Sequence, residues 1–135
     1  MTNRSTIIRS DIKNLFLYIG EDKLKKIEAI IHAHKLDDVK SSLITAGVIG
    51  MTISEVKAFG QKKGMTTRYR GTEYRVDFAT KIKIEAIIDD EMTDLVVQRI
   101  SIAGRTGEIG DGKIFVSHID EIVRIRTEEK GIAAI

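Results

Sequence analysis

Apolar and polar residues alternate in two segments of the chain that share an identical hexapeptide. KIEAII occurs at residues 26–31 and again at residues 83–88, 57 residues later. In both copies every second residue is apolar and most of these are β-branched, which is typical of a strand with one buried face. The repeat therefore predicts two strands that play equivalent parts in two copies of one unit.

Each predicted strand is followed by a segment with helical periodicity. The apolar residues recur three or four positions apart, as one buried helix face requires. They are Leu36, Val39, Leu43 and Ala46 in the first copy, and Met92, Val96, Ile100 and Ala103 in the second. Gly47 and Gly104 stand where helix C-caps are expected, and the acidic pairs 37–38 and 89–90 lie near the predicted helix starts.

A further strand is predicted after each helix, at Met51–Phe59 and at Lys113–His118. Two β-α-β units in tandem indicate an α+β fold, the ferredoxin-like βαββαβ sandwich, with an antiparallel sheet and both helices on one face. The other face would then meet water, a ligand or another subunit, so we expect a homo-oligomer.

The two halves are joined by residues 60–74, GQKKGMTTRYRGTEY, which are basic and follow neither period. Long loops in compact domains are usually functional. Because the flanking residues 56–59 and 75–78 have the composition of strand ends, we interpret the segment as an extended hairpin between the second and third strands of the sandwich.

A glycine-rich segment, TGEIGDGKIFV at residues 106–116, is a candidate phosphate site. Its three glycines allow the backbone to approach a ligand closely, and Lys113 adds a cation. Arg124 and Arg126 lie two residues apart among apolar residues, so on a strand both would face one side and could bind phosphate bidentately. On the loop alone, an ordinary hairpin turn is the alternative reading.

Composition limits the classes of function. The chain has 135 residues, 42% of them hydrophobic, and a net charge of +2, which suits one globular domain and does not demand nucleic acid. The absence of cysteine excludes disulfides, thiolate zinc sites and cysteine nucleophiles. Aromatic residues make up 5%, which is few for an RNA-binding sheet. His32 and His34 have the spacing of metal ligands, but no third ligand accompanies them, so we do not expect a metal site. The sequence offers no residue in a clear position to act as general base, so we do not expect an enzyme.

Residues 1–24 are expected to be an N-terminal extension of a domain that spans residues 25–135. Their apolar cluster at residues 15–19 is too short for a membrane span and lacks the features of a signal peptide. We interpret the extension as an arm in a cytoplasmic protein, with a transit peptide to the plastid stroma as the alternative.

The order of motifs from about Lys25 to the C-terminus resembles the PII nitrogen-regulatory signalling proteins. The motifs are KLDDVK (35–40), GMTISEVKAFG (50–60), YRGTEYRVDF (69–78), KIKIEAIIDD (81–90), RTGEIGDGKIFV (105–116) and VRIRT (123–127). The resemblance implies a homotrimer that binds ATP or ADP in the clefts between subunits. It also implies sensing of 2-oxoglutarate with Mg2+ and ATP, and regulation of nitrogen-metabolism enzymes or ammonium-type transporters through loop 60–74. Contact with a membrane would then be only indirect, through a transporter.

The same resemblance implies particular site residues. The nucleotide would be bound by Gly60, Glu85, Gly110, Asp111, Gly112 and Lys113 of one subunit, together with Thr52, Arg124 and Arg126 of its neighbour. Lys81 would pair with an oxoglutarate carboxylate. Tyr74 and Thr72 stand where some members of the family are uridylylated or phosphorylated on the loop.

The base of the loop departs from the family pattern. Lys62 stands where the family has a glutamine that helps to coordinate Mg2+, and an ammonium group has no acceptor for a cation. We therefore expect ATP and ADP binding to persist while 2-oxoglutarate sensing is weakened or altered. The chain would then report adenine-nucleotide state or another small anion. If the loop is shifted by one residue, Gln61 takes the glutamine's place and 2-oxoglutarate sensing survives. The identity of the regulated partner is left open.

Overall fold

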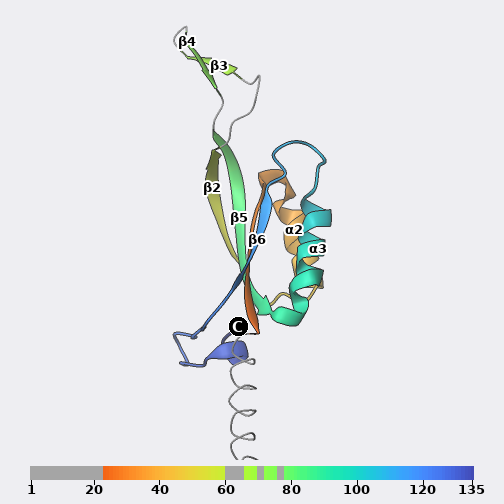
Figure 1. Cartoon of the computed structure of the whole chain (residues 1–135), viewed down its shortest axis with the longest axis vertical. Helices are drawn as coiled ribbons and strands as arrows, with labels where there is room; N and C mark the ends of the chain where they lie inside the picture. Colours follow the sequence, from red (N-terminus) through yellow and green to blue (C-terminus); the bar gives the residue numbers. More distant parts are fainter. Residues whose placement is uncertain (1–22, 60–65, 70–71, 76–77) are drawn as a thin grey trace, which may run out of the picture.

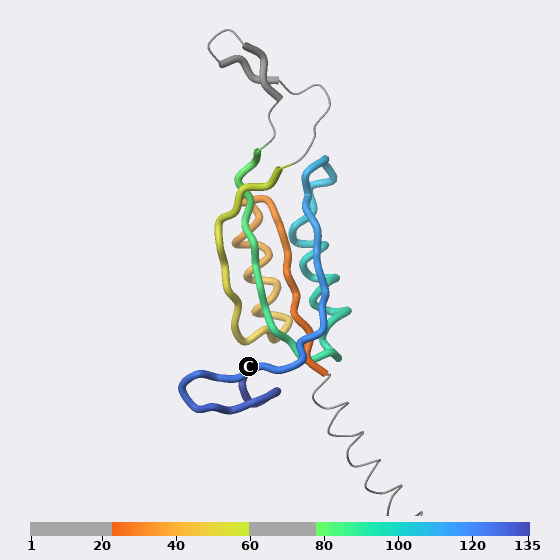
Figure 2. The backbone as a smooth tube through the Cα atoms, turned by 60° about the vertical axis from the view of Figure 1, so that its left-hand side comes forward, coloured from red at the N-terminus to blue at the C-terminus, as the bar shows by residue number. Residues whose placement is uncertain are grey.

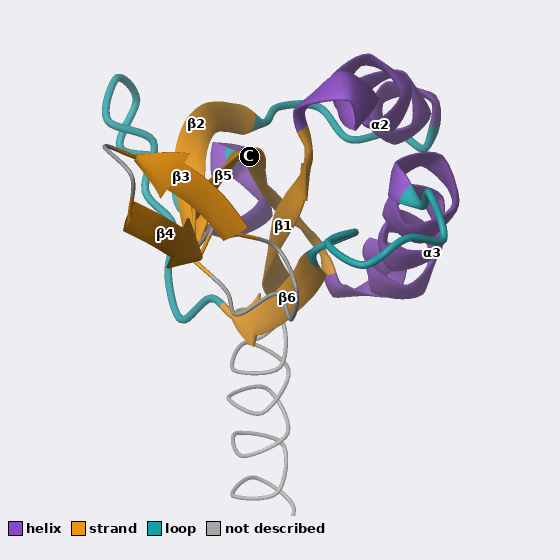
Figure 3. Ribbon diagram, turned by 90° about the horizontal axis from the view of Figure 1, so that it is seen from above, coloured by secondary structure: helices purple, strands orange, loops and turns teal. Residues whose placement is uncertain are grey.

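The computed structural model describes residues 23–59, 66–69, 72–75 and 78–135, and its centre is a four-stranded antiparallel sheet. The strands are β1 (Leu24–His32), β2 (Thr52–Phe59), β5 (Phe78–Asp89) and β6 (Lys113–His118), in the order β2-β5-β1-β6. Helices α2 (Leu36–Thr45) and α3 (Thr93–Gly104) both cover the same face of this sheet (Figures 1 and 3). The predicted ferredoxin-like arrangement is confirmed.

The two copies of the hexapeptide pair with each other at the centre of the sheet. Strands β1 and β5 are antiparallel, and Ile27 lies opposite Ala86 while Ile31 lies opposite Ile82. Glu28 and Glu85, the same residue of each copy, lie opposite one another. The sequence repeat is therefore a structural repeat whose halves meet through equivalent strands.

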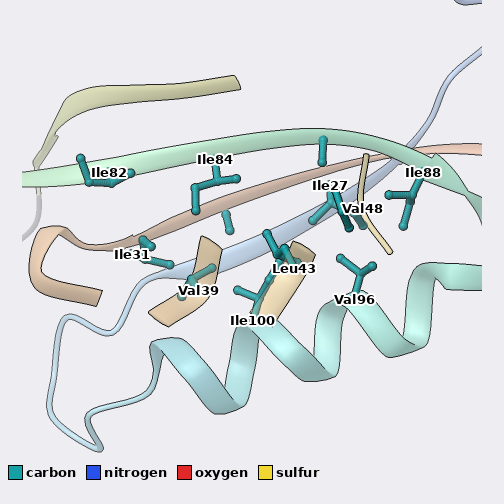
Figure 4. Close-up of a cluster of buried hydrophobic side chains, with 12 residues drawn as sticks. Ile27, Ile31, Val39, Leu43, Val48, Ile82, Ile84, Ile88, Val96 and Ile100 are labelled. Carbon is teal, nitrogen blue, oxygen red and sulfur yellow. The ribbon is translucent and has the colours of Figure 1, made fainter. Parts of the chain in front are cut away.

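The core lies between the sheet and the two helices (Figure 4). Val39 of α2 and Val96 of α3 are fully buried, and they pack with the helix-facing side chains of β1 and β5. Burial of one such side chain stabilises the fold by about 1.5–3 kcal/mol. The predicted core is confirmed at the following buried positions: Ile27, Ala29, Ile31, Val39, Leu43, Ile82, Ile84, Ala86, Ile88, Val96 and Ile100.

The two predicted helix C-caps have different outcomes. Gly47 follows α2 with φ +98°, a left-handed conformation that suits glycine, as predicted. Gly104 is instead the last residue of α3 and is buried, and Arg105 after it is extended with φ −75°. The cap prediction for Gly104 is wrong, because α3 leaves its last turn directly into extended backbone.

The predicted acidic residues lie at the start of the second helical segment, where one of them also caps it. The carboxylate of Asp89 accepts a hydrogen bond of 3.0 Å from the backbone N–H of Glu91, at a short 3-10 helix (Asp90–Met92) that leads into α3. Two further 3-10 helices are Ala33–Lys35, before α2, and Gly131–Ala134, near the end of the chain.

The described part of the segment between the halves forms a second, two-stranded sheet. Strands β3 (Thr66–Tyr69) and β4 (Thr72–Arg75) are antiparallel, with Thr67 opposite Tyr74, in agreement with the predicted hairpin (Figure 1). Thr72 and Tyr74 both lie on β4. Gly60, Gln61 and Lys62 lie outside the described residues, as does nearly all of the predicted N-terminal extension.

Within the described ranges, no helix is long and apolar enough to cross a membrane.

Candidate functional site

The glycine-rich loop, residues 105–112, joins the end of α3 to the start of β6. Gly107, Gly110 and Gly112 have φ values of +85°, +103° and +90°. At Gly112 a Cβ atom would lie 1.8 Å from the carbonyl oxygen of Ile30 in β1, so only glycine fits. At this point the backbone of the loop lies against β1. The predicted close approach to a ligand is a different contact and stays a prediction.

Asp111 holds the loop in this shape. Its carboxylate accepts hydrogen bonds from the backbone N–H groups of Thr106, at 3.1 Å, and Gly107, at 2.9 Å. The Thr106 hydroxyl also donates to it. These bonds, with the hydroxyl contributing most, lower the pKa of the Asp111 carboxyl to about 2. Asp111 is thus an anion whose oxygens are already engaged inside the loop.

Lys81 and His32 connect the loop to the sheet. Lys81 is 7% exposed, and its Nζ donates to the carbonyl oxygen of Gly110 at 2.6 Å. The same Nζ lies 3.0 Å from Nδ1 of His32, whose Nε2 lies 3.1 Å from Oδ1 of Asp111. Lys81 therefore lies beside the glycine loop, and its predicted pairing with an oxoglutarate carboxylate stays a prediction.

Sequence reasoning did not identify His32 as part of this site. It lies opposite Lys81 in the β1–β5 register, and its ring stacks on that of His34 with centroids 5.2 Å apart. Only the pairing of β1 with β5 places His32 beside Lys81, so the strand register was the missing signal. In the described part of the chain, no group of three or more His, Cys, Asp or Glu residues is arranged to hold a metal ion.

A cleft of about 270 Å³ lies beside the loop, between the end of α3 and strands β1 and β6. Its lining combines apolar core residues with Arg105, Asp111 and Lys113. Lys113 is the first residue of β6, directly after the loop. The loop therefore has a cation and a concave surface on the same side.

Thr52 and Glu85 form a second group of predicted site residues. They lie opposite one another in the β2–β5 register and line a cleft of about 330 Å³ together with the end of the chain at Ala134 and Ile135. Glu85 forms ion pairs with Lys83 at 2.9 Å and with Lys26 at 3.5 Å. Both lysines lower the pKa of the Glu85 carboxyl, with the Lys83 hydrogen bond contributing most.

The strand predicted for Arg124 and Arg126 is wrong. Residues 125–127 form a turn, closed by a hydrogen bond of 2.8 Å from the N–H of Glu128 to the carbonyl oxygen of Arg124, and Glu128 has φ +60°. Apart from one isolated bridge, Val123 to Lys130, this segment finds no ladder partner among the described residues. The argument that both arginines share a strand face therefore fails.

Arg124 is nevertheless held in a defined place. Its Nη2 donates to the carbonyl oxygen of Ile135 at 2.7 Å, and its Nη1 lies 3.7 Å from Oε1 of Glu129. It thus lies beside the second cleft, which Ile135 also lines.

The predicted site residues consequently form two groups at opposite ends of the sheet. The glycine loop lies at one end, and residues 119–135 lie at the other (Figures 1 and 2). Strand β6 alone, from Lys113 to His118, covers roughly 17 Å. Within one chain, Lys113 and Arg124 therefore cannot contact the same polyphosphate.

Comparisons with known proteins agree on one family. The family model for "Nitrogen regulatory protein P-II" matches residues 24–129. Curated relatives called "Nitrogen regulatory protein P-II" include those of Synechocystis sp., 57% identical, Nostoc punctiforme, 55% identical, and Rhizobium meliloti, 53% identical. Each alignment covers 83% of this chain and 100% of the relative.

A solved structure supports the same assignment. The crystal structure of Arabidopsis thaliana PII bound to citrate matches with a TM-score of 0.69 and 34% sequence identity, over 84% of this chain and 94% of that one. The similarity extends over both halves of the sandwich.

Proposed function

The chain belongs to the nitrogen regulatory protein P-II family, whose members are signalling proteins rather than enzymes, and we propose that it forms a homotrimer that binds ATP or ADP between neighbouring copies. In the proposed site, Gly110, Asp111, Gly112 and Lys113 of one copy would face Thr52, Arg124 and Arg126 of the next. Gly60 completes the set on the side of the glycine loop. Glu85 was expected on that side too, but it lies opposite Thr52 in one chain, so we propose that the copy that supplies Thr52 also supplies Glu85.

One observation carries this proposal: the two groups of candidate residues are at opposite ends of the sheet in one chain (Figure 1). A polyphosphate needs several cations at once, and one chain supplies Lys113 and Arg124 too far apart. A second copy that brings its Arg124 against the first copy's glycine loop would remove that difficulty. One face of the sheet is not covered by the helices of the described residues. Phe115 lies on that face, opposite Glu28 of β1, and is half-exposed, which is a further reason to expect assembly.

Subunit mixing tests the shared site directly. Lys113→Ala and the double variant Arg124→Ala with Arg126→Ala should each lose ATP binding, because each lost charge-assisted hydrogen bond is worth about 1.5–3 kcal/mol. If the two proteins are unfolded together and refolded as mixed trimers, about a quarter of the sites receive intact residues from both sides. Calorimetry should then detect ATP binding. If binding does not return, a site between copies is contradicted.

We propose in addition that Lys81 binds a small anion, for which 2-oxoglutarate is the first candidate. Lys81 is buried beside the glycine loop, and the related Arabidopsis thaliana PII was crystallised with citrate, also a polycarboxylate. The alternative is a variant sensor that responds to adenine-nucleotide state or to another small anion and has lost 2-oxoglutarate, because Lys62 would repel Mg2+.

Titration with 2-oxoglutarate separates these readings. The variant reading predicts weak binding of 2-oxoglutarate by the native chain with Mg2+ and ATP, and tighter binding after Lys62→Gln. The control is ATP alone, whose affinity should change little. Tight, Mg2+-dependent binding by the native chain would favour the register in which Gln61 acts, and the variant sensor would be abandoned.

The proposed output is a contact between segment 60–74 and a nitrogen-metabolism enzyme or an ammonium-type transporter. Within this segment, strands β3 and β4 form a sheet of their own, separate from the four-stranded sheet (Figure 1). Thr72 and Tyr74 on β4 are the proposed modification positions. The proposed setting is the cytoplasm, or the stroma if the N-terminal extension is a transit peptide.

A further inference from the structure

A continuous chain of polar contacts runs from the sheet into the glycine loop. It starts at Lys81 on β5, passes through His32 at the end of β1, and reaches Asp111, with separations of 3.0 Å and 3.1 Å. Asp111 then accepts from the backbone N–H groups of Thr106 and Gly107. This series of contacts thus joins the proposed anion-binding lysine to the loop proposed to bind phosphate.

Hydrogen-bond chemistry determines which atom donates and which accepts in each of these contacts. A lysine ammonium has only donors, so Nδ1 of His32 must accept from Lys81. Nε2 then carries the ring proton and donates to the Asp111 carboxylate. A neutral His32 in this one tautomer satisfies both contacts, whereas a proton on Nδ1 would face the ammonium group. The titratable groups seen against the ring are Lys81, Asp111 and the stacked His34.

We propose that His32 is a positioning residue that couples Lys81 to the shape of the glycine loop. His32 would thereby determine how strongly a carboxylate or phosphate bound by Lys81 changes the affinity of the loop for nucleotide phosphate. The nucleotide part of this inference rests on the proposed function, whereas the coupling between Lys81 and the loop amides does not.

The physical reason is competition for the donors of Lys81. Its ammonium already donates to Gly110 and to His32, and an anion attracts the same N–H groups. When Nζ turns toward the anion, the imidazole loses the donor that fixes its tautomer, and its bond to Asp111 is no longer enforced. Asp111 orients the N–H groups of Thr106 and Gly107, so the loop changes with it. Coupling between sites of this kind is typically 5–150-fold in affinity.

Amide hydrogen exchange without ligand tests the coupling itself. Lys81→Met should speed exchange at Thr106 and Gly107 in the native background, and the increase should be much smaller in a His32→Leu background. The residual increase measures the direct contact of Lys81 with Gly110. Equal increases in both backgrounds would show that Lys81 acts without His32, and the inference would be rejected.

A conservative variant distinguishes positioning from simple packing. In His32→Gln, the side-chain oxygen can accept from Lys81 and the amide nitrogen can donate to Asp111, so the influence of Lys81 should return in part. If His32→Gln behaves like His32→Leu while both remain folded, transmission by hydrogen bonds is contradicted.

The ligand experiment measures ATP affinity by calorimetry with and without the probe 2-oxoglutarate, and again with citrate, in the presence of Mg2+. In the native chain at least one probe should change ATP affinity by about 5-fold or more. In His32→Leu, the ratio of the ATP affinities with and without the probe should be close to one. Thr106→Val is the matched control: it removes the hydroxyl bond to Asp111, so it should weaken ATP binding while keeping the ratio.

The outcomes separate this inference from the proposed function. If the native chain binds no ATP, the proposed function fails and the exchange experiment still decides the coupling. If the native chain binds ATP but neither probe changes the affinity, or if the ratio survives in His32→Leu, the inference fails while the nucleotide site stands.

Discussion

At Gly112 the glycine loop lies so close to β1 that the position accepts no side chain. We expect Gly112→Ala to lower the free energy of unfolding by about 3 kcal/mol or more, because its Cβ would overlap the carbonyl oxygen of Ile30. The matched control is Gly107→Ala. Gly107 also has positive φ, but its Cβ would meet open space, so we expect about 1–2 kcal/mol from backbone strain alone. Urea denaturation measures both, and equal losses would contradict the packing of the loop on β1.

Asp111 gives the fold a specific dependence on pH. Its folded pKa, about 2, is below the ordinary value of 3.8, so its stabilising bonds are fully present above pH 3.8 and are lost as the pH falls toward 2. The difference in melting temperature between the native protein and Asp111→Asn should therefore be constant near neutrality and shrink between about pH 4 and pH 2. If the difference in melting temperature does not change with pH, the negative charge of the Asp111 carboxylate is not what stabilises its hydrogen bonds with the loop N–H groups.

Residue types alone indicated which residues were available for phosphate chemistry, but not how they are engaged. Asp111 was predicted as a nucleotide contact, and its oxygens are engaged by Thr106 and Gly107 within the loop. His32 was considered only with His34, as a metal-ligand pair that lacks a third ligand, yet it lies between Lys81 and Asp111. These contacts join residues 49 and 79 positions apart in sequence, so no local pattern contains them.

At the scale of elements, the predictions held where the pattern was local and long. The hexapeptide copies alternate over a whole strand, and both became central strands with their apolar sides buried. Around Arg124 the apolar alternation is as clear but shorter. The chain turns at residues 125–127, because a strand also needs a ladder partner and, among the residues that the structure describes, this segment forms a single bridge. The sequence could not reveal that difference.

Gly104 offers a test of one corrected element boundary. A glycine that caps a helix in the left-handed conformation is destabilised by alanine, whereas a glycine within a helix is stabilised by it. At Gly104 a Cβ would make ordinary contacts of 3.5 Å with Val39 and 3.6 Å with Ile31. We expect Gly104→Ala to leave stability unchanged or to raise it by up to about 1 kcal/mol. Gly47→Ala, at φ +98°, should destabilise and serves as the opposite control. If chemical denaturation shows that Gly104→Ala clearly lowers stability, the prediction that Gly104 is a helix cap would be supported after all.

At the scale of the whole molecule, the α-helices of the described residues cover one face of the sheet and leave the other without a helical layer. Residues that lie opposite one another in the ladder point to the same face, so Phe115 shares the uncovered face with Glu28, its partner on β1. Phe115 is 49% exposed there. An aromatic side chain on an uncovered face, together with a binding site divided between two ends of the sheet, gives two independent reasons for the chain to associate with copies of itself.

This association should be visible in the mass of the native protein in solution. The native chain should sediment with about three times its mass of 15.1 kDa. Phe115→Lys should shift it toward the monomer, because an ammonium group buried between copies would lose its hydration. Within one chain the new lysine would lie opposite Glu28, so the monomer fold should be retained. Val116→Lys is the matched control: Val116 is 46% exposed, but it pairs with the buried Ile27 and so belongs to the helix side of the edge strand. Analytical ultracentrifugation with circular dichroism distinguishes loss of assembly from loss of fold. If Phe115→Lys remains a trimer, the uncovered face is not the surface on which the copies meet, and the divided nucleotide site must be closed in another way.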